Sequence, residues 1–372
     1  MGSDPLRIAL VIERFEPAGG GVEGAAWRVA QGLAAAGEDV HVFARQGTES
    51  DSVTLHRLPV PTFWQPLRVW AFSRKAASAT RSGFDVVHSF SRTRHQDVYR
   101  AGGGSHADFL ERAHKGKGRG WRHFSPRHAT LLAMESRIFA DASQLVQCNS
   151  EMVRDELQRR YGIPDSRLVV LANGIDLERF HPGLRAEHRT RIRAELGTSE
   201  ALPVWLLAGS GFRRKGVDTA LRALGHTATG SELWIVGRDD PAPWRDTAAR
   251  FGVAERVRFL GHRSDMPALY GAADALVLPT RYDAFANVCL EAAACGLPVV
   301  TTQADGAARW LGSHGLALED PEDWEGLAKR LDELSDPEIR AKWGAAARAR
   351  AEGQSWSHHV EKLRELYARV HR

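Results

Sequence analysis

The sequence predicts an α/β protein made of two doubly wound, parallel-sheet domains. Its 372 residues exceed the usual span of one domain, short apolar runs alternate with helical patterns, and a polar stretch interrupts this alternation after Pro182. Buried strands that alternate with helices are typical of parallel sheets covered on both faces. We therefore expect two such domains facing each other across a cleft, which is where ligands bind in this fold class.

The first half opens with a strand, a glycine-rich turn, a helix and a second strand. The apolar run from Arg7 to Glu13 predicts a buried strand, and the Ala-rich segment from Val22 to Ala36 predicts a helix that Gly37 ends. Val40 to Phe43 begins the next strand, which completes a βαβ opening. Further strands are predicted at residues 85–88, 98–99, 145–148 and 168–171.

A polar, Arg- and Glu-rich stretch from Gly183 to Leu202 is expected to separate the halves. The strands of the second half are predicted at residues 204–208, 233–236, 257–260, 275–278 and 298–301. The segment from Ser355 to Tyr367 predicts an amphipathic helix, whose apolar face includes Val360, Leu363, Leu366 and Tyr367.

The composition excludes several classes of protein. Hydrophobic residues make up 43% and charged residues 26% of the chain, a balance that argues against disorder and fibres. No stretch approaches ~18 consecutive apolar residues, so no transmembrane helix is expected, and the first residues lack the form of a secretory signal. The cysteines Cys148, Cys289 and Cys295 form no C-x-x-C pair, which predicts neither a disulfide framework nor a zinc site and favours a cytoplasmic protein.

The net charge of +4 is unevenly distributed. From Ser52 to His128 there are fourteen Arg and Lys residues against four acids, a balance of +10, so the rest of the chain carries −6. This asymmetry indicates an anionic partner for the first half.

A glycine-rich loop from Gly19 to Glu23 connects the first predicted strand and helix. Glycines let the backbone approach a ligand closely, and the helix N-terminus behind them favours an anion. A tight strand-to-helix turn without a ligand explains the same pattern, and the residues alone leave both readings open.

A basic loop from Ser210 to Gly216 has the same position in the second half. Three consecutive cations, Arg213, Arg214 and Lys215, follow a predicted buried strand and precede a helix. Cations at this place suit a diphosphate, because they neutralise the charge that builds up on a leaving group. The alternative is a solvated basic loop.

Two carboxylates, Asp283 and Glu291, lie eight residues apart at the end of another strand. Asp283 is placed on a loop, whereas Glu291 lies inside a predicted helix at residues 287–295, among apolar neighbours. A buried acid of this kind needs hydroxyl or amide partners, and the diol of a ribose would supply two hydroxyls.

This segment, Arg281 to Glu291, resembles the E-x7-E signature of retaining glycosyltransferase family 4, whose members have two Rossmann-like domains in the GT-B architecture. Four other motifs match the family in the correct order, at residues 19–23, 171–182, 213–216 and 272–279. Within the family, residues 97–101, 135–139 and 212–218 look like those of the lipopolysaccharide core heptose α-1,3-glucosyltransferases.

The resemblance implies a donor site. Asp283 would lie near the donor sugar, and Glu291 would hold the ribose hydroxyls. The donor diphosphate would be bound by Arg213, Arg214 and Lys215, with the principal arginine left open. The remaining donor contacts would come from Gly20, Gly21 and Val22 and from the turn formed by Phe285, Ala286, Asn287 and Val288.

The chain departs from the family pattern at two positions of the signature. The first acid is usually Glu, whereas Asp283 is one methylene shorter, and Ala286 replaces a common glycine. Backbone amides of the turn would still favour an anion at the helix N-terminus.

His106 is the candidate catalytic residue of the first half. Many family members have a histidine at the end of the corresponding strand, close to the reacting sugar. A hydrogen-bonded structural histidine is the alternative reading, and Asp108 is a candidate substitute for an acid that the related subgroup places a few residues earlier.

The resemblance implies transfer of a hexosyl group, glucose from a UDP-sugar, to a hydroxyl of a lipopolysaccharide core or related glycolipid, with retention of configuration. No cofactor is expected to be permanently bound, because the nucleotide-diphosphate sugar is a co-substrate. No metal is expected either, since Arg and Lys supply the positive charge, and Asp239 and Asp240 are assigned to a surface turn.

The same family pattern predicts the domain roles. Residues 1–182 would form the acceptor-binding domain, to which a returning helix at 355–372 is added, and residues 183–354 would form the donor-binding domain.

A basic stretch from Arg112 to Arg127 interleaves cations with Trp121 and Phe124. This pattern suits an anionic membrane surface, although a solvated loop explains it as well. The expected location is cytoplasmic, peripheral on the inner face of the cytoplasmic membrane.

Two other functions remain open from the sequence. One is a family 4 enzyme that makes a soluble glycoside or disaccharide. The other is a non-catalytic nucleic-acid-binding protein that uses the +10 region, although no nucleic-acid motif accompanies that region and no nucleic-acid partner is expected.

Overall fold

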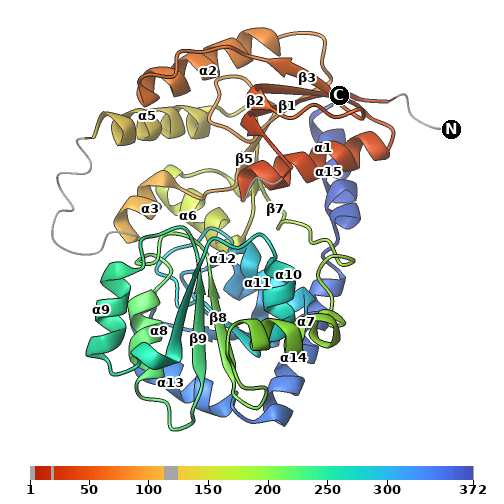
Figure 1. Cartoon of the computed structure of the whole chain (residues 1–372). Helices are drawn as coiled ribbons and strands as arrows, with labels where there is room; N and C mark the ends of the chain where they lie inside the picture. The colour runs from red at the N-terminus through yellow and green to blue at the C-terminus, as the bar shows by residue number, and fades with distance from the viewer. Residues whose placement is uncertain (1–4, 18–20, 113–124, 372) are drawn as a thin grey trace. The chain divides into compact units, whose positions relative to one another are not determined.

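The structure, a computed structural model, describes residues 5–17, 21–112 and 125–371. The chain divides into two compact units (Figure 1): unit 1 consists of Met1–Gly174 and Trp356–Arg372, and unit 2 of Ile175–Ser355. Each unit contains one sheet whose neighbouring strands are all parallel.

The sheet of unit 1 has seven strands in the order β3-β2-β1-β4-β5-β6-β7. The order of the chain reverses beside β1, which lies between β2 and β4, and this switch point is where doubly wound sheets bind ligands. The strands are β1 (Arg7–Phe15), β2 (Asp39–Gly47), β3 (Thr54–Arg57), β4 (Val86–Ser89), β5 (Val98–Ala101), β6 (Leu145–Cys148) and β7 (Leu168–Val170).

Helices cover both faces of this sheet because successive side chains of a strand point to opposite faces. Ile8 and Leu10 of β1 pack in a cluster with residues of α1 and α15, whereas Val11 packs with Phe72 of α2. The helices of unit 1 are α1 (Val22–Ala35), α2 (Gln65–Ala79), α3 (His106–Arg112), α5 (Pro126–Ala140), α6 (Glu151–Tyr161) and α15 (Trp356–Val370), with a short turn η1 (Asp165–Arg167).

The C-terminal helix α15 returns to unit 1, as the family resemblance implied. Leu363, Leu366 and Tyr367 are buried against the core, and Arg364 Nε lies 2.6 Å from Glu38 Oε1. The Tyr367 hydroxyl also lies 2.8 Å from the ring nitrogen Nδ1 of His88, which is fully buried.

The sheet of unit 2 has six strands in the order β10-β9-β8-β11-β12-β13, with the switch point between β8 and β11. The strands are β8 (Val204–Ala208), β9 (Glu232–Val236), β10 (Val257–Gly261), β11 (Ala275–Val277), β12 (Val299–Thr302) and β13 (Leu316–Leu318). The helices are α7 (Leu184–Glu195), α8 (Val217–Leu224), α9 (Ala242–Arg250), α10 (Met266–Ala272), α11 (Asn287–Ala294), α12 (Gly306–Leu311), α13 (Trp324–Glu333) and α14 (Pro337–Glu352), with the turns η2 (Ala254–Arg256) and η3 (Gly312–His314).

The polar stretch at residues 183–202 is part of unit 2 and contains α7, which packs against α10. Arg193 of α7 is fully buried, and its Nη2 atom lies 2.6 Å from Asp274 Oδ2. Its other guanidinium nitrogens donate to the carbonyl oxygens of Ala272, Ser199 and Leu202. A buried charge is tolerated here because every nitrogen has a partner.

Two parallel α/β units of this kind confirm the predicted fold class. Edge strands β3 and β13 were not predicted. None of the helices within the described residues is long and apolar enough to span a bilayer.

Candidate active site

The predicted basic loop lies at the switch point of unit 2, between β8 and α8. Gly209, Gly211 and Gly216 have φ angles of 130°, 82° and 75°, a region that glycine adopts readily. A Cβ atom on Gly216 would lie 2.0 Å from the carbonyl oxygen of Pro279, which follows β11. Glycine at this position therefore lets the loops after β8 and β11 approach each other.

These two loops bring Asp283 together with two of the three predicted cations. Lys215 Nζ lies 2.7 Å and Arg214 Nη1 2.8 Å from Asp283 Oδ2. Burial raises the pKa of Asp283, but the charges of Lys215 and Arg214 outweigh it and hold the pKa below its usual value. Arg213 is exposed, so the structure distinguishes the two arginines that the sequence left equivalent.

The predicted turn from Phe285 to Val288 leads into α11. Phe285 and Ala286 are buried, whereas Asn287 and Val288 are partly exposed. The Ala286 amide donates to Asp305 Oδ1 at 3.1 Å, which fixes the turn just before the helix begins.

Asp305 is a buried carboxylate that the sequence analysis missed. It also accepts from the Ala307 amide at 2.9 Å and from the Thr301 hydroxyl at 2.9 Å. Burial, followed by the charge of Asp283, raises the pKa of Asp305. Its position was not visible in the sequence because it depends on the bridge that pairs Asp283 with Asp305.

Glu291 lies in α11 and has a partner that the sequence analysis also missed. The hydroxyl of Tyr270, on α10, donates to Glu291 Oε2 at 2.7 Å. Burial raises the pKa of Glu291, although the residue remains partly exposed. Tyr270 therefore holds one oxygen of the Glu291 carboxylate in place.

Asp239 was assigned to a surface turn, and the structure shows a further contact. Its Oδ2 and Oδ1 atoms accept from the amides of Gly211 and Phe212 at 2.7 and 3.2 Å. Asp239 therefore holds the loop that carries the cations.

The predicted site residues of unit 1 lie far in the sequence from the residues of unit 2 described above. The contacts of His106 and Asp108 are with other residues of unit 1. His106, the first residue of α3, has Nε2 3.0 Å from Nδ1 of His128, and its amide donates to Glu135. Chiefly burial lowers the pKa of His106 to about 4. The carboxylate of Asp108 is engaged by two arginines of α6, which favours a structural role for this acid.

At the glycine-rich loop of unit 1, Gly21 has a φ angle of 62° and precedes α1, which begins at Val22. Gly20 lies outside the described residues, as does most of the basic stretch Arg112–Arg127, namely residues 113–124.

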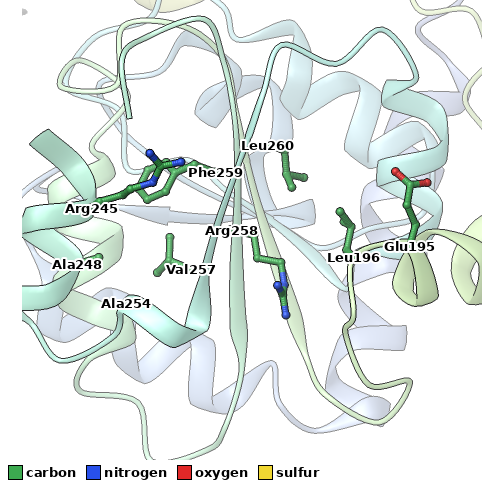
Figure 2. A pocket seen from close by; sticks show the side chains of 9 residues that line it. All are labelled: Glu195, Leu196, Arg245, Ala248, Ala254, Val257, Arg258, Phe259 and Leu260. Atoms are coloured by element: carbon green, nitrogen blue, oxygen red, sulfur yellow. The ribbon is translucent and has the colours of Figure 1, made fainter. Parts of the chain in front are cut away.

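A hollow of about 540 Å³ lies elsewhere in unit 2, at the edge strand β10 (Figure 2). None of the predicted site residues lines it. Two of its three charged lining residues form ion pairs, since Arg258 pairs with Glu232 at 2.8 Å and Glu195 with Arg263 at 3.1 Å. Among the described residues, no group of three or more His, Cys, Asp or Glu side chains is placed to hold a metal ion.

Two family models match the chain: one described as Glycosyltransferase Family 4, over residues 19–179, and one described as Glycosyl transferases group 1, over residues 203–336. The chain belongs to glycosyltransferase family 4. This confirms the recognition made from the ordered motifs. Membership of this family favours an enzyme over a non-catalytic nucleic-acid-binding protein.

Several family 4 relatives show how far the similarity extends. The lipopolysaccharide glucosyltransferase WaaG of Escherichia coli K12 is 27% identical over 371 residues, which cover 96% of this chain and 98% of WaaG. A crystal structure of WaaG, described as a glycosyltransferase involved in lipopolysaccharide biosynthesis, has a TM-score of 0.81 at 26% identity and covers 97% of this chain and 99% of that one.

Other similarities are partial or concern the fold alone. The D-inositol 3-phosphate glycosyltransferase of Salinispora arenicola is 33% identical over 254 residues, or 63% of this chain. The match spans a little over half of that enzyme, 56% of its length. Anabaena HepE, solved with UDP and glucose, shares the fold with a TM-score of 0.72 at 19% identity and covers 98% of this chain and 100% of that one.

Proposed function

We propose that this family 4 enzyme is a retaining hexosyltransferase that moves glucose from UDP-glucose to a hydroxyl of a lipopolysaccharide core or related glycolipid. The observation that carries the donor half of the proposal is the cluster of Asp283, Lys215 and Arg214 at the switch point of unit 2. The WaaG similarity over nearly the whole chain supports the acceptor class, and the UDP and glucose in HepE support the donor.

The charges of the cluster suit a departing diphosphate. Arg213, Arg214 and Lys215 give three positive charges against the two negative charges of Asp283 and Asp239, so the loop keeps an excess of positive charge. Lys215 Nζ has three hydrogens, of which Asp283 accepts one. The remaining donors stabilise charge on the leaving group without a metal.

The other residues would position the donor and the acceptor. Glu291 accepts hydrogen bonds from the ribose diol, and Asp283 lies beside the donor sugar. A β-phosphate oxygen takes the proton of the acceptor hydroxyl, so that the new bond forms on the face from which the diphosphate departs, with no protein nucleophile. In unit 1, which binds the acceptor at the cytoplasmic face of the membrane, His106 is the residue that acts close to the reacting sugar.

The alternative is a soluble acceptor that carries a phosphate. The D-inositol 3-phosphate glycosyltransferase similarity at 33% identity favours it. A panel of acceptors distinguishes the two: transfer to a lipid-linked core oligosaccharide supports the glycolipid, whereas transfer to inositol phosphate alone supports the soluble product.

The donor assignment is tested with two substitutions and a matched control. Glu291→Ala should weaken UDP binding about tenfold or more, because a buried hydrogen bond to a charged group contributes about 1.5–3 kcal/mol. Lys215→Met keeps the aliphatic stem and removes the charge, so it should lower kcat about 100-fold or more. Lys329→Met, at an exposed position of α13, should change neither.

Binding is measured by calorimetry with UDP, GDP and ADP, and turnover by release of the nucleoside diphosphate. Unchanged UDP affinity in Glu291→Ala would contradict the ribose assignment. An equally active Lys215→Met enzyme would contradict the role of Lys215 at the diphosphate. Preferential binding of GDP or ADP would show that the donor carries guanosine or adenosine and not uridine.

A further inference from the structure

Arg100 is a buried cation of unit 1 that has no counter-ion among the described residues. It lies in β5 and is 2% exposed. Its Nη2 atom donates to the neutral side chain of Asn173 at 2.6 Å, whereas Nε and Nη1 are buried and have no hydrogen-bond partner in the part of the chain that the structure describes. The ring of Phe90, whose centre lies 5.4 Å from the guanidinium carbon, is an apolar contact that does not replace these hydrogen bonds. Arg193, the fully buried arginine of unit 2, pairs with Asp274 instead.

The charge of Arg100 acts on buried neighbours that are themselves neutral. It adds to the effect of burial in lowering the pKa values of His88 and His359. Burial also lowers the pKa of Arg100 to about 10, so the guanidinium keeps its charge at neutral pH. A buried charge costs free energy unless a partner compensates it, and an anion beside Arg100 would remove much of this cost.

A buried acceptor without a donor lies beside the same glycine as Arg100. Asn149, which follows β6, donates from Nδ2 to the carbonyl oxygen of Gly102 at 2.8 Å, and its Oδ1 atom has no partner among the described residues. A Cβ atom on Gly102 would overlap Nη1 of Arg100. The unpaired donors of Arg100 and the unpaired acceptor of Asn149 therefore meet at Gly102. A ligand that satisfies both needs an anionic group and a hydroxyl group.

This place is the carboxyl end of β5 and β6, the edge at which parallel sheets bind ligands. Gly102 is partly exposed and Gly103 is exposed, so the guanidinium lies close beneath the surface of the loop. The covering residue has no side chain, and a small displacement of its backbone brings Nη1 into contact with a ligand.

We propose that Arg100 and Asn149 form a binding site for a phosphate group at the carboxyl ends of β5 and β6. The planar guanidinium matches the oxygens of a phosphate, and Asn149 Oδ1 accepts from a hydroxyl of the same ligand. The phosphate is either a substituent of a sugar or polyol acceptor or a free phosphate ion. The site is separate from the donor site of unit 2, and it rests on the proposed function only where the phosphate belongs to the acceptor.

The test is hydrogen exchange of the full-length protein, measured by mass spectrometry in inorganic phosphate and in sodium chloride of equal ionic strength. Phosphate should protect the peptides that cover residues 98–110, and a titration of this protection gives the affinity. The local readout separates this site from the basic loop of unit 2, which also attracts phosphate.

Three variants examine the contact with the guanidinium. Arg100→Met removes the charge and should weaken phosphate binding about tenfold or more, because hydrogen bonds to charged groups are the strong ones. Gly102→Ala should have a similar effect, since the added Cβ atom displaces Nη1. Gly103→Ala is the matched control: a Cβ atom there would meet nothing within 4 Å, and neither glycine has a positive φ angle. It should bind phosphate like the wild-type protein.

The source of the phosphate is distinguished by repeating the titration with myo-inositol 1-phosphate and with neutral myo-inositol. Binding of the inositol phosphate that is tighter than that of inorganic phosphate, and that Asn149→Ala reduces to the same level, supports the phosphate of a polyol acceptor. Equal affinities for the two support the site with free phosphate as its ligand.

The proposal has controls that are independent of the donor assignment. Arg100→Met should bind UDP with wild-type affinity, and Lys215→Met should keep the phosphate response of residues 98–110. Failure of the donor site and failure of this site are therefore distinguishable. Circular dichroism verifies that each variant is folded, and the two glycine variants decide the question if Arg100→Met does not fold.

Three results would overturn the proposal. The first is unchanged exchange at residues 98–110 of the wild-type protein in phosphate, as expected if only water meets the donors of Arg100. The second is wild-type phosphate affinity in both Arg100→Met and Gly102→Ala. The third is an equal loss of affinity in Gly102→Ala and Gly103→Ala, which would show that the loop responds without the guanidinium.

Discussion

Three carboxylates of unit 2 hold the site, and they do so in two different ways. Asp283 binds the cations directly, at 2.7 Å from Lys215 and 2.8 Å from Arg214. Asp305 and Asp239 bind backbone amides instead, one in the turn before α11 and the other in the loop after β8. Asp305 and Asp239 therefore fix the backbone around the proposed diphosphate site and need not touch the substrate.

Asp239 provides a prediction at this scale. Asp239→Ala removes both acceptors from the Gly211 and Phe212 amides and should loosen the basic loop, which should weaken UDP binding about tenfold or more. Asp240→Ala is the matched control, because Asp240 is exposed and its carboxylate accepts only from Ala242 among the bonds found. Calorimetry with UDP measures both, and equal affinities would show that Asp239 does not position the loop.

The candidate site could be predicted from the sequence only as a set of residues. The two loops were identified by glycines, by three consecutive cations and by two acids spaced eight residues apart, because each of these patterns lies within a short segment of the sequence. The partners Asp239, Tyr270 and Asp305 could not be predicted, because each contact joins segments that only the folded sheet brings together. The separation of Arg214 from Arg213 likewise depends on where Asp283 lies.

At the scale of elements, the predicted strands were those with continuous apolar runs. β8, with all five residues buried, was predicted with its exact bounds. β3 was missed because it is an edge strand with no fully buried residue, and β13 because it is a short edge strand whose middle residue is exposed. The polar stretch at residues 183–202 looked like a linker because its buried arginine, Arg193, is stabilised by Asp274, far away in the sequence.

The contact of α15 with α1 gives a prediction in which one substitution changes the stability in opposite directions in two backgrounds. A Cβ atom on Gly32 of α1 would lie 2.5 Å from Val360 Cγ2 of α15. Gly32→Ala gains about 1 kcal/mol of helix propensity, but overpacking costs about 1–3 kcal/mol, so the free energy of unfolding should fall. In a Val360→Ala background the same substitution should raise stability by roughly 0.5–1 kcal/mol. Urea unfolding of the four proteins measures this cycle, and the same sign in both backgrounds would exclude the steric explanation.

At the scale of the whole molecule, the two units differ in their buried titratable groups. His88, His106 and His359, whose pKa values burial lowers, all belong to unit 1. For His106 and His359 the pKa falls to about 4. In unit 2, burial raises the pKa of the carboxyl groups of Glu291 and Asp305. The two sets of groups couple stability to pH in opposite directions.

Mild acid should therefore destabilise unit 1 before unit 2. Between pH 6.5 and about 4 the unfolded chain binds protons at these histidines and the native unit does not, so the free energy of unfolding falls by up to about 1.4 kcal/mol per pH unit for each proton. Glu291 and Asp305 take up protons in native unit 2 at a higher pH than in the unfolded chain. Protonation of these two groups as the pH falls therefore raises the stability of unit 2. Hydrogen exchange measured by mass spectrometry should show protection lost from α15 and the sheet of unit 1 as the pH falls, and less loss in unit 2. His359→Gln retains a donor for Ala172 O and should reduce the pH dependence of the stability of unit 1 by one proton. A parallel loss of protection in both units would show that these histidines do not control the acid response.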